Sequence, residues 1–235
     1  LSLTPTDTVV TTACVAGRMF KDDWEEKFLK PVQTHFKDNL FLEVQAHVDD
    51  KQKEYGYPIY IIADEPYREI LFDGAVCPFI PNYYDNTVIC YSFSKALSIP
   101  GERIGYLAVS DKAAYREDLN FAIAGAARAL GHINAPSLLQ QVMEQCLGET
   151  SDISKYKENR DILCGGLSEM GYNCVKPDGA FYLFVKAPNG DANAFCQKAK
   201  VEHNLLVVPG DGFGCPGYLR LSYCVSGEMI RRSLP

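Results

Sequence analysis

The chain has 235 residues, 47% of them hydrophobic, and a formal net charge of −7 at pH 7. This length allows one large or two modest domains with a sizeable core. The acidic balance and the lack of a Lys/Arg run argue against nucleic acid as a partner, and no apolar run approaches the roughly 18 residues that span a bilayer. The first residues are polar and do not form a secretory leader. We expect a globular, cytoplasmic protein without a membrane segment.

The cysteines and histidines predict no metal site. Nine cysteines are scattered along the chain without a C-x-x-C pair, and their odd number favours reduced, mostly buried thiols over a disulfide framework. The four histidines form no close ligand pair, so we expect no zinc and assign the histidines no chemistry.

The first 55 residues predict one strand-to-helix turn followed by helices. Residues 3–19 combine a polar turn, a short β-branched strand and the start of a helix. A helix N-terminus binds anions readily, so this turn is a candidate phosphate contact. Between residues 21 and 55 apolar residues recur at four-residue spacing, which predicts one or two helices that pack against the core.

Two apolar runs end at ionisable side chains. PIYIIA over residues 58–63 is followed at once by Asp64, and TVICYSF over residues 87–93 ends two residues before Lys95. Both runs are rich in β-branched and aromatic residues and predict buried strands. Because ligands of open α/β sheets bind at the carboxyl ends of strands, we expect the acid and the amine side by side there.

The residues around the lysine suit a phosphorylated cofactor. Ser92, Ser94 and Arg103 offer hydroxyls and a forked cation for a phosphate. Tyr67, three residues after the acid, adds a phenol. Pyridoxal phosphate needs an amine that forms an imine, a partner for its pyridine nitrogen, a partner for its ring oxygen and a phosphate anchor. Each of these roles has one candidate in the chain.

The rest of the chain predicts a strand, a helical connection and a compact α+β unit. Residues 105–110 read as a strand, and residues 111–147 as helices joined near residues 131–137. Beyond residue 152 we expect a helix, a strand over 180–185, a helix over 192–203, and strands over 205–209 and 218–224. The glycine-rich run at 210–217 lies between two strands, which excludes a dinucleotide loop and favours a turn that aims Arg220.

Four motifs together carry a family resemblance. They are ADEPY at 63–67, SFSKALSIPGERIGY at 92–106, DGAFYLFV at 178–185 and YLRLSYC at 218–224. In this order, with eight residues from lysine to arginine, they resemble fold-type I pyridoxal phosphate-dependent aminotransferases of the aspartate aminotransferase class (class I/II). The match runs from about Tyr55 to the end.

The resemblance implies a shortened version of the family's α/β fold. Residues 1–110 would form part of a three-layer α/β/α large domain with a mainly parallel sheet, residues 111–148 connecting helices, and residues 149–235 a small α+β domain. The family's N-terminal part is largely missing before about Tyr55, so we expect a fragment. A homodimer is implied as well.

For the cofactor ring, the resemblance implies three contacts. Lys95 would form the imine with the cofactor aldehyde and move the α-proton of the substrate. Asp64 would pair with the pyridine nitrogen, and Tyr67 would donate a hydrogen bond to the ring oxygen. A helix cap for Asp64 and a core position for Tyr67 remain open as alternatives.

For the phosphate, the resemblance implies Arg103 in a forked geometry, helped by Ser92. The backbone amides of Val15 and Ala16 would add contacts from the first turn. A surface pair of Arg103 with Glu102 and a plain strand-to-helix turn at Val15 are the alternatives.

For the substrate, the resemblance implies that Arg220 grips the α-carboxylate by two parallel hydrogen bonds. Phe181 would line the pocket, although a plain core aromatic is the alternative. The implied reaction transfers an amino group from an α-amino acid similar to aspartate or glutamate to a 2-oxo acid.

Two departures from the family leave other functions open. The family's aromatic residue that stacks on the cofactor ring and its N-P-x-N-P-T-G segment are not found in this sequence. A catalytically impaired relative that binds cofactor weakly or acts as an interaction protein therefore remains an alternative. A lyase on the same scaffold is another, because the chemistry of Lys95 also supports β-elimination.

Overall fold

The computed structural model describes residues 48–234. Within them the chain forms two compact units: residues 48–66 and 78–151 make the first, and residues 67–77 and 152–234 make the second. The expected strand and helices before residue 48, including Val15 and Ala16, lie outside the described residues. Residues 48–55, the last part of the predicted helical interval, are helical.

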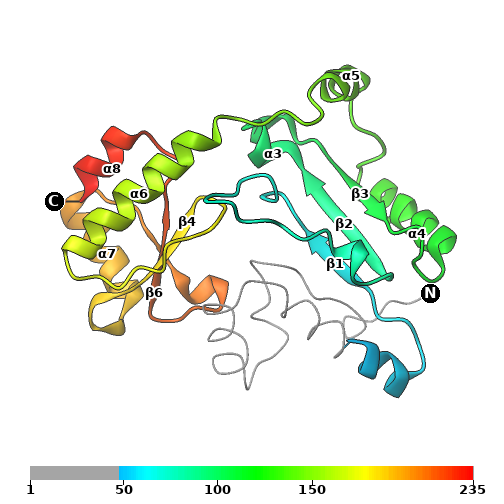
Figure 1. The fold of residues 1–235 in the computed structure, drawn as a ribbon, viewed down its shortest axis with the longest axis horizontal. Coiled ribbons are helices and arrows are strands. Elements are labelled where there is room, and N and C mark those ends of the chain that lie inside the picture. Colours follow the sequence, from blue (N-terminus) through cyan, green and yellow to red (C-terminus); the bar gives the residue numbers. More distant parts are fainter. Residues whose placement is uncertain (1–47, 235) are drawn as a thin grey trace. The chain divides into compact units, whose positions relative to one another are not determined.

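A mixed three-stranded sheet organises the first unit. It consists of β1 (Ile61–Asp64), β2 (Thr87–Ser92) and β3 (Gly105–Val109), in that order (Figure 1). Strands β1 and β2 are parallel, whereas β3 pairs with β2 antiparallel. The expected sheet was mainly parallel. The link from β2 to β3, residues 93–104, contains only the short turns α3 and η4 and no crossover helix, and the chain turns back to pair antiparallel with β2.

Short helices flank this sheet. The turn α3 (Phe93–Ala96) follows β2 directly, and α4 (Arg116–Ala129) and α5 (Ser137–Gln145) follow β3, with 3₁₀ turns η3 (Ile80–Asn82) and η4 (Pro100–Glu102) in the loops. The predicted pair of helices joined near residues 131–137 is thus confirmed. Met143 of α5 packs with Ile89 and Tyr91 of β2 in one of the unit's cores.

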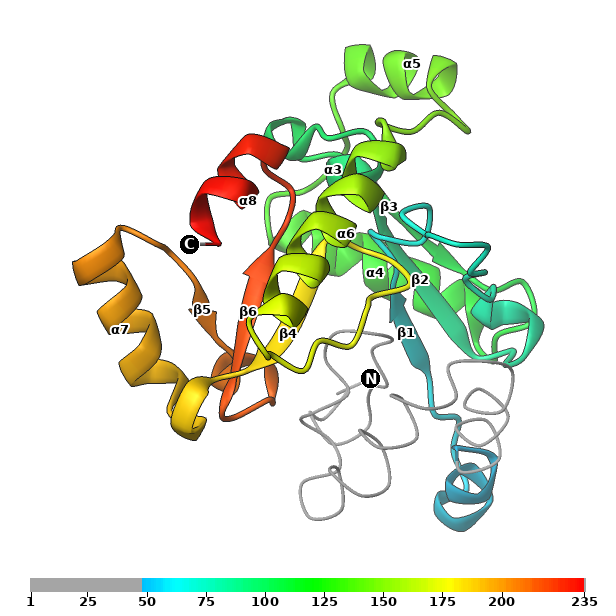
Figure 2. The same ribbon diagram turned by 60° about the vertical axis from the view of Figure 1, so that its left-hand side comes forward.

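The second unit combines an antiparallel sheet with three helices. Its strands are β4 (Tyr182–Lys186), β5 (Val208–Pro209) and β6 (Tyr218–Ser222), in the order β4-β6-β5. Its helices are α6 (Ile153–Glu169), α7 (Ala192–His203) and α8 (Gly227–Ser233), with 3₁₀ turns η5 (Pro188–Gly190) and η6 (Gly210–Phe213). Helices α6 and α8 lie side by side (Figures 1 and 2). Strand β5 is shorter than the predicted 205–209, and α8 was not predicted.

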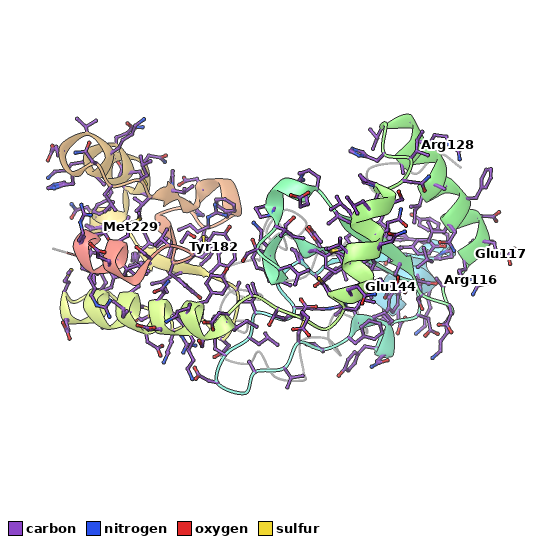
Figure 3. The ribbon with its side chains drawn as sticks, turned by 90° about the horizontal axis from the view of Figure 1, so that it is seen from above. Arg116, Glu117, Arg128, Glu144, Tyr182 and Met229 are labelled. Carbon is purple, nitrogen blue, oxygen red and sulfur yellow. The ribbon has the colours of Figure 1, made fainter. Side chains whose placement is uncertain are left out.

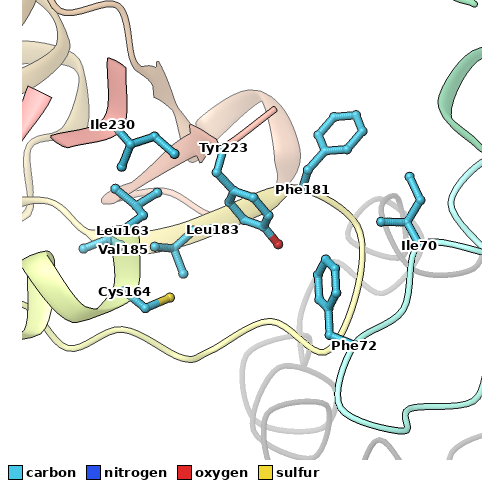
Figure 4. Close-up of a cluster of buried hydrophobic side chains, with 9 residues drawn as sticks. All are labelled: Ile70, Phe72, Leu163, Cys164, Phe181, Leu183, Val185, Tyr223 and Ile230. Carbon is cyan, nitrogen blue, oxygen red and sulfur yellow. The ribbon is translucent and has the colours of Figure 1, made fainter. Parts of the chain in front are cut away.

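Alternation along the strands separates a core face from an outer face of this sheet. Leu183 and Val185 of β4 and Leu219 of β6 are at most 3% exposed, whereas Tyr182 and Arg220 point to the opposite face. The core face packs against α6 and α8. Its largest cluster comprises Ile70, Phe72, Leu163, Cys164, Phe181, Leu183, Val185, Tyr223 and Ile230 (Figure 4).

The segment 67–77 belongs to the second unit although it lies between β1 and β2 in the sequence. Ile70 and Phe72 fill the core of the second unit, and Leu71 forms a β-bridge with Gly179. The segment was expected in the large domain, residues 1–110. Its two apolar side chains need partners from α6 and β4, and such long-range pairing leaves no local signature.

A buried arginine fastens this segment to α6. The side chain of Arg160 is fully buried, and its guanidinium donates to Asp73 at 2.7 Å, to Asp161 at 2.9 Å and to the carbonyl of Pro177 at 2.8 Å. It also lies 4.7 Å from the ring centroid of Phe72. Because each of the three guanidinium nitrogens donates a hydrogen bond, Arg160 connects three stretches of chain at one point.

The cysteines are less buried than predicted. Of the eight described cysteines, Cys164 and Cys196 are buried and Cys77 and Cys224 are exposed. A thiol on a strand edge or a loop is not drawn into the core by its own hydrophobicity.

No helix in the described part of the chain is both long and apolar enough to cross a bilayer.

Candidate functional site

The carboxyl ends of β1 and β2 lie next to each other, as predicted. Asp64 is the last residue of β1 and pairs in register with Cys90, and the Glu65 amide donates to the Cys90 carbonyl at 2.9 Å. Partial desolvation of the Asp64 carboxyl raises its pKa. A cationic partner would offset this desolvation of the charged carboxylate.

Lys95 sits in a helical turn directly after β2. Strand β2 ends at Ser92, one residue earlier than predicted, and α3 begins at Phe93. The Ser92 hydroxyl caps this turn: it accepts from the Ser94 amide at 3.2 Å and lies 2.7 Å from the Ser94 hydroxyl. The cap holds the half-buried Lys95 at the end of the strand.

Arg103 lies in the chain just before β3, next to the same end of β2. Its backbone is left-handed (φ 53°, ψ 43°), its side chain is exposed, and its guanidinium donates to the Pro100 carbonyl at 2.9 Å. The next residue, Ile104, accepts from the Phe93 amide at 3.2 Å. Arg103 forms no ion pair with Glu102, so the alternative of a surface Arg-Glu pair is not realised. Its remaining N–H groups can bind an anion.

Gly105 allows the close pairing of β3 with this end of β2. It lies opposite Ser92, and a Cβ atom added there would stand 2.2 Å from the Tyr91 carbonyl oxygen. Real Cβ contacts are never so short, so only glycine fits without a shift of the strands. The position of Arg103 two residues earlier therefore depends on this glycine.

Tyr67 is part of the second unit. Its hydroxyl donates to the Tyr182 hydroxyl at 3.4 Å, and its ring meets the ring of Phe181 edge-on at 5.3 Å. The side chain is half-buried rather than fully enclosed. Its predicted role beside Asp64 and Lys95, which belong to the first unit, stays a prediction.

Arg220 projects from the outer face of the second sheet between aromatic rings. It lies opposite Phe184 of β4, and its guanidinium carbon is 4.5 Å from the ring centroid of Tyr182 and 3.7 Å from that of Phe213. Within residues 48–234 no carboxylate pairs with this guanidinium. A half-buried cation without a counter-charge favours an anionic ligand.

Phe181 lies on the core face rather than beside Arg220. It is 5% exposed and packs with Ile70 and Phe72. This position favours the core alternative over a substrate-pocket role, because Phe181 precedes β4 and its side chain is enclosed by the core cluster, where its ring also lies 5.0 Å from the Tyr182 ring.

The aromatic neighbours of Arg220 are two residues that the sequence analysis missed. Alternation along AFYLFV could have identified Tyr182, since it shares a face with Phe184, the residue opposite Arg220. Phe213 lies in the 3₁₀ turn η6 within the glycine-rich run, and no local signal marked it.

Metal-ligand clusters of His, Cys, Asp and Glu are absent from the described residues.

Comparisons with a family model and with curated proteins point to the same family. Residues 50–234 match the family described as aminotransferase class I and II. The aspartate aminotransferase of Thermotoga maritima is 30% identical over 181 residues, which cover 74% of this chain and 45% of that protein. A probable aspartate aminotransferase of Methanocaldococcus jannaschii is 32% identical over 191 residues, 76% of this chain and 48% of that protein. The chain thus spans about half the length of the curated relatives it matches.

Solved structures show the same relationship. An amino transferase from Eubacterium rectale superposes with a TM-score of 0.84 at 48% identity, over 97% of this chain and 53% of that one. The aspartate aminotransferase of Thermotoga maritima superposes with a TM-score of 0.67 at 28% identity, over 81% and 49% of the two chains. By sequence and by α/β fold, this chain belongs to the class I and II aminotransferases.

Proposed function

We propose that this chain binds pyridoxal phosphate at Lys95 and takes part in transferring an amino group from an α-amino acid to a 2-oxo acid. Aminotransferases of this family are pyridoxal phosphate-dependent enzymes. The observation that carries the proposal is the adjacency of the β1 and β2 ends, which brings the Asp64 position and the Lys95 turn to one edge of the sheet. The Ser92 cap and Arg103 stand at the same end of β2.

The residues of the first unit fit the cofactor chemically. The hydroxyls of Ser92 and Ser94 and the exposed guanidinium of Arg103 would hold the phosphate. Asp64 would hold the pyridine nitrogen, and that pairing would offset the desolvation that raises the pKa of its carboxyl. When bound, the cofactor supplies a ring that withdraws electrons from the substrate Cα.

Lys95 would perform two steps. Its amine would hold the cofactor covalently, and once an incoming amino acid had freed it, the same amine in its neutral form would accept the proton from the substrate Cα and deliver it to the cofactor carbon that becomes the amine donor. Its place in a capped turn after β2 restricts the amine to the end of that strand. General acid–base catalysis by a positioned group contributes about 10²–10⁴-fold to a rate.

Arg220 would hold the substrate's α-carboxylate by two parallel N–H donors. This contact favours amino acids and 2-oxo acids over simple amines. Several relatives are named aspartate aminotransferases, and we propose dicarboxylic substrates such as aspartate and glutamate on that basis. By analogy with the family, we also propose that the protein forms a homodimer and acts in the cytoplasm.

Reduction with borohydride tests the assignment of Lys95. The chain is mixed with pyridoxal phosphate, reduced, digested and mapped by mass spectrometry, and its visible absorbance is recorded before and after glutamate is added. We expect the label on Lys95 and a loss of absorbance with glutamate. Lys95→Ala should lose the label while its circular dichroism stays that of the wild type, whereas Lys112→Ala, at an exposed lysine of the same unit, should keep it.

The outcomes separate the alternatives. A label elsewhere, or none, would contradict the assignment and favour a relative without a working cofactor site. A new amino acid together with a 2-oxo acid indicates transamination, whereas pyruvate together with free ammonia indicates elimination.

A further inference from the structure

We infer that Phe213 and Tyr182 are positioning residues that hold the guanidinium of Arg220 in the orientation needed to bind a carboxylate. The inference rests on the proposed function, because it concerns how Arg220 meets the substrate. The two rings lie 3.7 Å and 4.5 Å from the guanidinium carbon. Figure 3 labels Tyr182 in the second unit, whose side chains are drawn as sticks.

The glycine-rich run 210–217 places Phe213 against the arginine. A Cβ atom added to Gly210 would stand 2.3 Å from the Cys215 carbonyl oxygen, so the two ends of the turn touch. Gly214 is left-handed (φ 73°), and its amide donates back to the Asp211 carbonyl. The turn is therefore closed by backbone contacts that only glycine permits, and its one large side chain, Phe213, covers Arg220.

Strand β4 supplies the other ring. Tyr182 lies on the same outer face as Arg220, and its hydroxyl accepts a hydrogen bond from Tyr67 at 3.4 Å. This contact fixes the tyrosine ring from a third stretch of chain. Arg220 is thus stacked between a rigid turn and a strand, while no carboxylate in the described residues takes up its in-plane donors.

This arrangement has a physical consequence for binding. Aromatic rings attract the flat face of a guanidinium. The N–H groups at its edge stay available, and these groups form the forked contact with a planar carboxylate. An arginine already held in place loses less side-chain freedom when the ligand binds. Removing one ring should weaken carboxylate binding by about tenfold, because the ligand must then order the freed arginine side chain itself.

The first experiment measures binding without turnover. Arginine Nε–Hε signals of the chain are followed by NMR during titration with 2-oxoglutarate, and the Arg220 signal is assigned by its loss in Arg220→Lys. We expect Phe213→Met, which keeps the volume but not the ring, to raise the Kd about tenfold. Phe213→Tyr should restore the wild-type value. Phe184→Leu is the matched control, since Phe184 shares the face and touches Phe213 but makes no ring contact with Arg220.

The second experiment uses the cofactor-loaded protein. The KM for glutamate should rise about tenfold in Phe213→Met while kcat stays within about twofold, because the lost contact acts on binding of substrate and transition state alike. If Phe213→Met lowers the unfolding temperature, Tyr182→Met tests the same idea through the other ring.

The results distinguish the two levels of the proposal. If the wild-type Arg220 signal does not respond to 2-oxoglutarate, the carboxylate role of Arg220 fails and the inference falls with it. If the wild type binds through Arg220 and both ring variants bind equally well, only the positioning role is refuted. An equal loss in Phe184→Leu would also refute it, because general packing would then explain the effect.

Discussion

Replacing Arg160 with methionine should destabilise the chain by about 3 kcal/mol. The methionine keeps most of the volume and the contact with Phe72, so the loss is chiefly polar. The Pro177 carbonyl is left without its donor at 2.8 Å, which costs about 1–3 kcal/mol, and the charge-assisted bonds to Asp73 and Asp161 disappear.

The two aspartates themselves add little to this cost. Their side chains are 41% and 42% exposed, and they keep Lys157 at 2.6 Å and Lys176 at 2.8 Å as partners. Exposed carboxylates with a remaining cation lose little more than a surface ion pair. The destabilisation therefore stays at about 3 kcal/mol, the lower end of the roughly 3–5 kcal/mol expected for a broken buried pair.

Urea unfolding followed by circular dichroism measures the loss, and hydrogen exchange locates it. The Phe72 and Ala180 amides, which donate to Asp178 and Ile70 at 2.8 Å each, should exchange faster in the variant. Arg128→Met is the control, because Arg128 is exposed on α4 (Figure 3) and should change stability by less than about 0.5 kcal/mol. Equal stabilities of both variants, with unchanged exchange at these amides, would refute the reasoning.

Three further predictions concern other positions. Lys157 and Arg160 lower the pKa of Asp73 from 3.8 to about 2, so the ionised carboxyl stabilises the fold above pH 4 and loses this effect as the pH falls towards 2; Asp73→Asn should flatten that part of a curve of urea stability against pH, and an unchanged slope would contradict this. Gly105→Ala should cost about 2–4 kcal/mol, since its Cβ would clash with the strand opposite; an unaltered melting temperature would show that β3 can shift freely. Leu183→Ala, at a fully buried site, should cost about 3 kcal/mol by the same urea assay, and a loss below about 1 kcal/mol would mean that the core closes over the cavity.

Local patterns were enough to predict what depends on neighbouring residues. The apolar runs before Asp64 and Lys95 gave the β1 and β2 strands within a few residues, and the helix over 192–203 was predicted with its observed bounds. The adjacency of the two strand ends followed from the general rule for α/β sheets. The two strands and the helix are each encoded by a short run of consecutive residues, whereas the adjacency needed the additional rule for strand ends.

Features that rest on distant contacts were not predictable in this way. The assignment of residues 67–77 to the second unit depends on Arg160 and on the bridge from Leu71 to Gly179. The resemblance placed Phe181 in the substrate pocket, whereas its side chain packs in the core of the second unit against residues that are distant in the sequence, such as Ile70 and Phe72. Helix α8 did carry a local signal, since Ser226 caps it by accepting from the Met229 amide.

The path of segment 67–77 also governs how the protein can be made and cut. This segment leaves the ribosome long before α6 and β4, so Ile70 and Phe72 stay without their core partners until most of the chain has been synthesised. A gene fragment that encodes only residues 152–235 would lack these two side chains and the β-bridge at Leu71. A protease cut in the first unit between residues 78 and 151 would likewise break the covalent link between this segment and the C-terminal core that depends on it. Neither unit is a continuous stretch of polypeptide: the first uses residues up to 151, whereas the second must wait for the C-terminal residues that enclose Ile70 and Phe72.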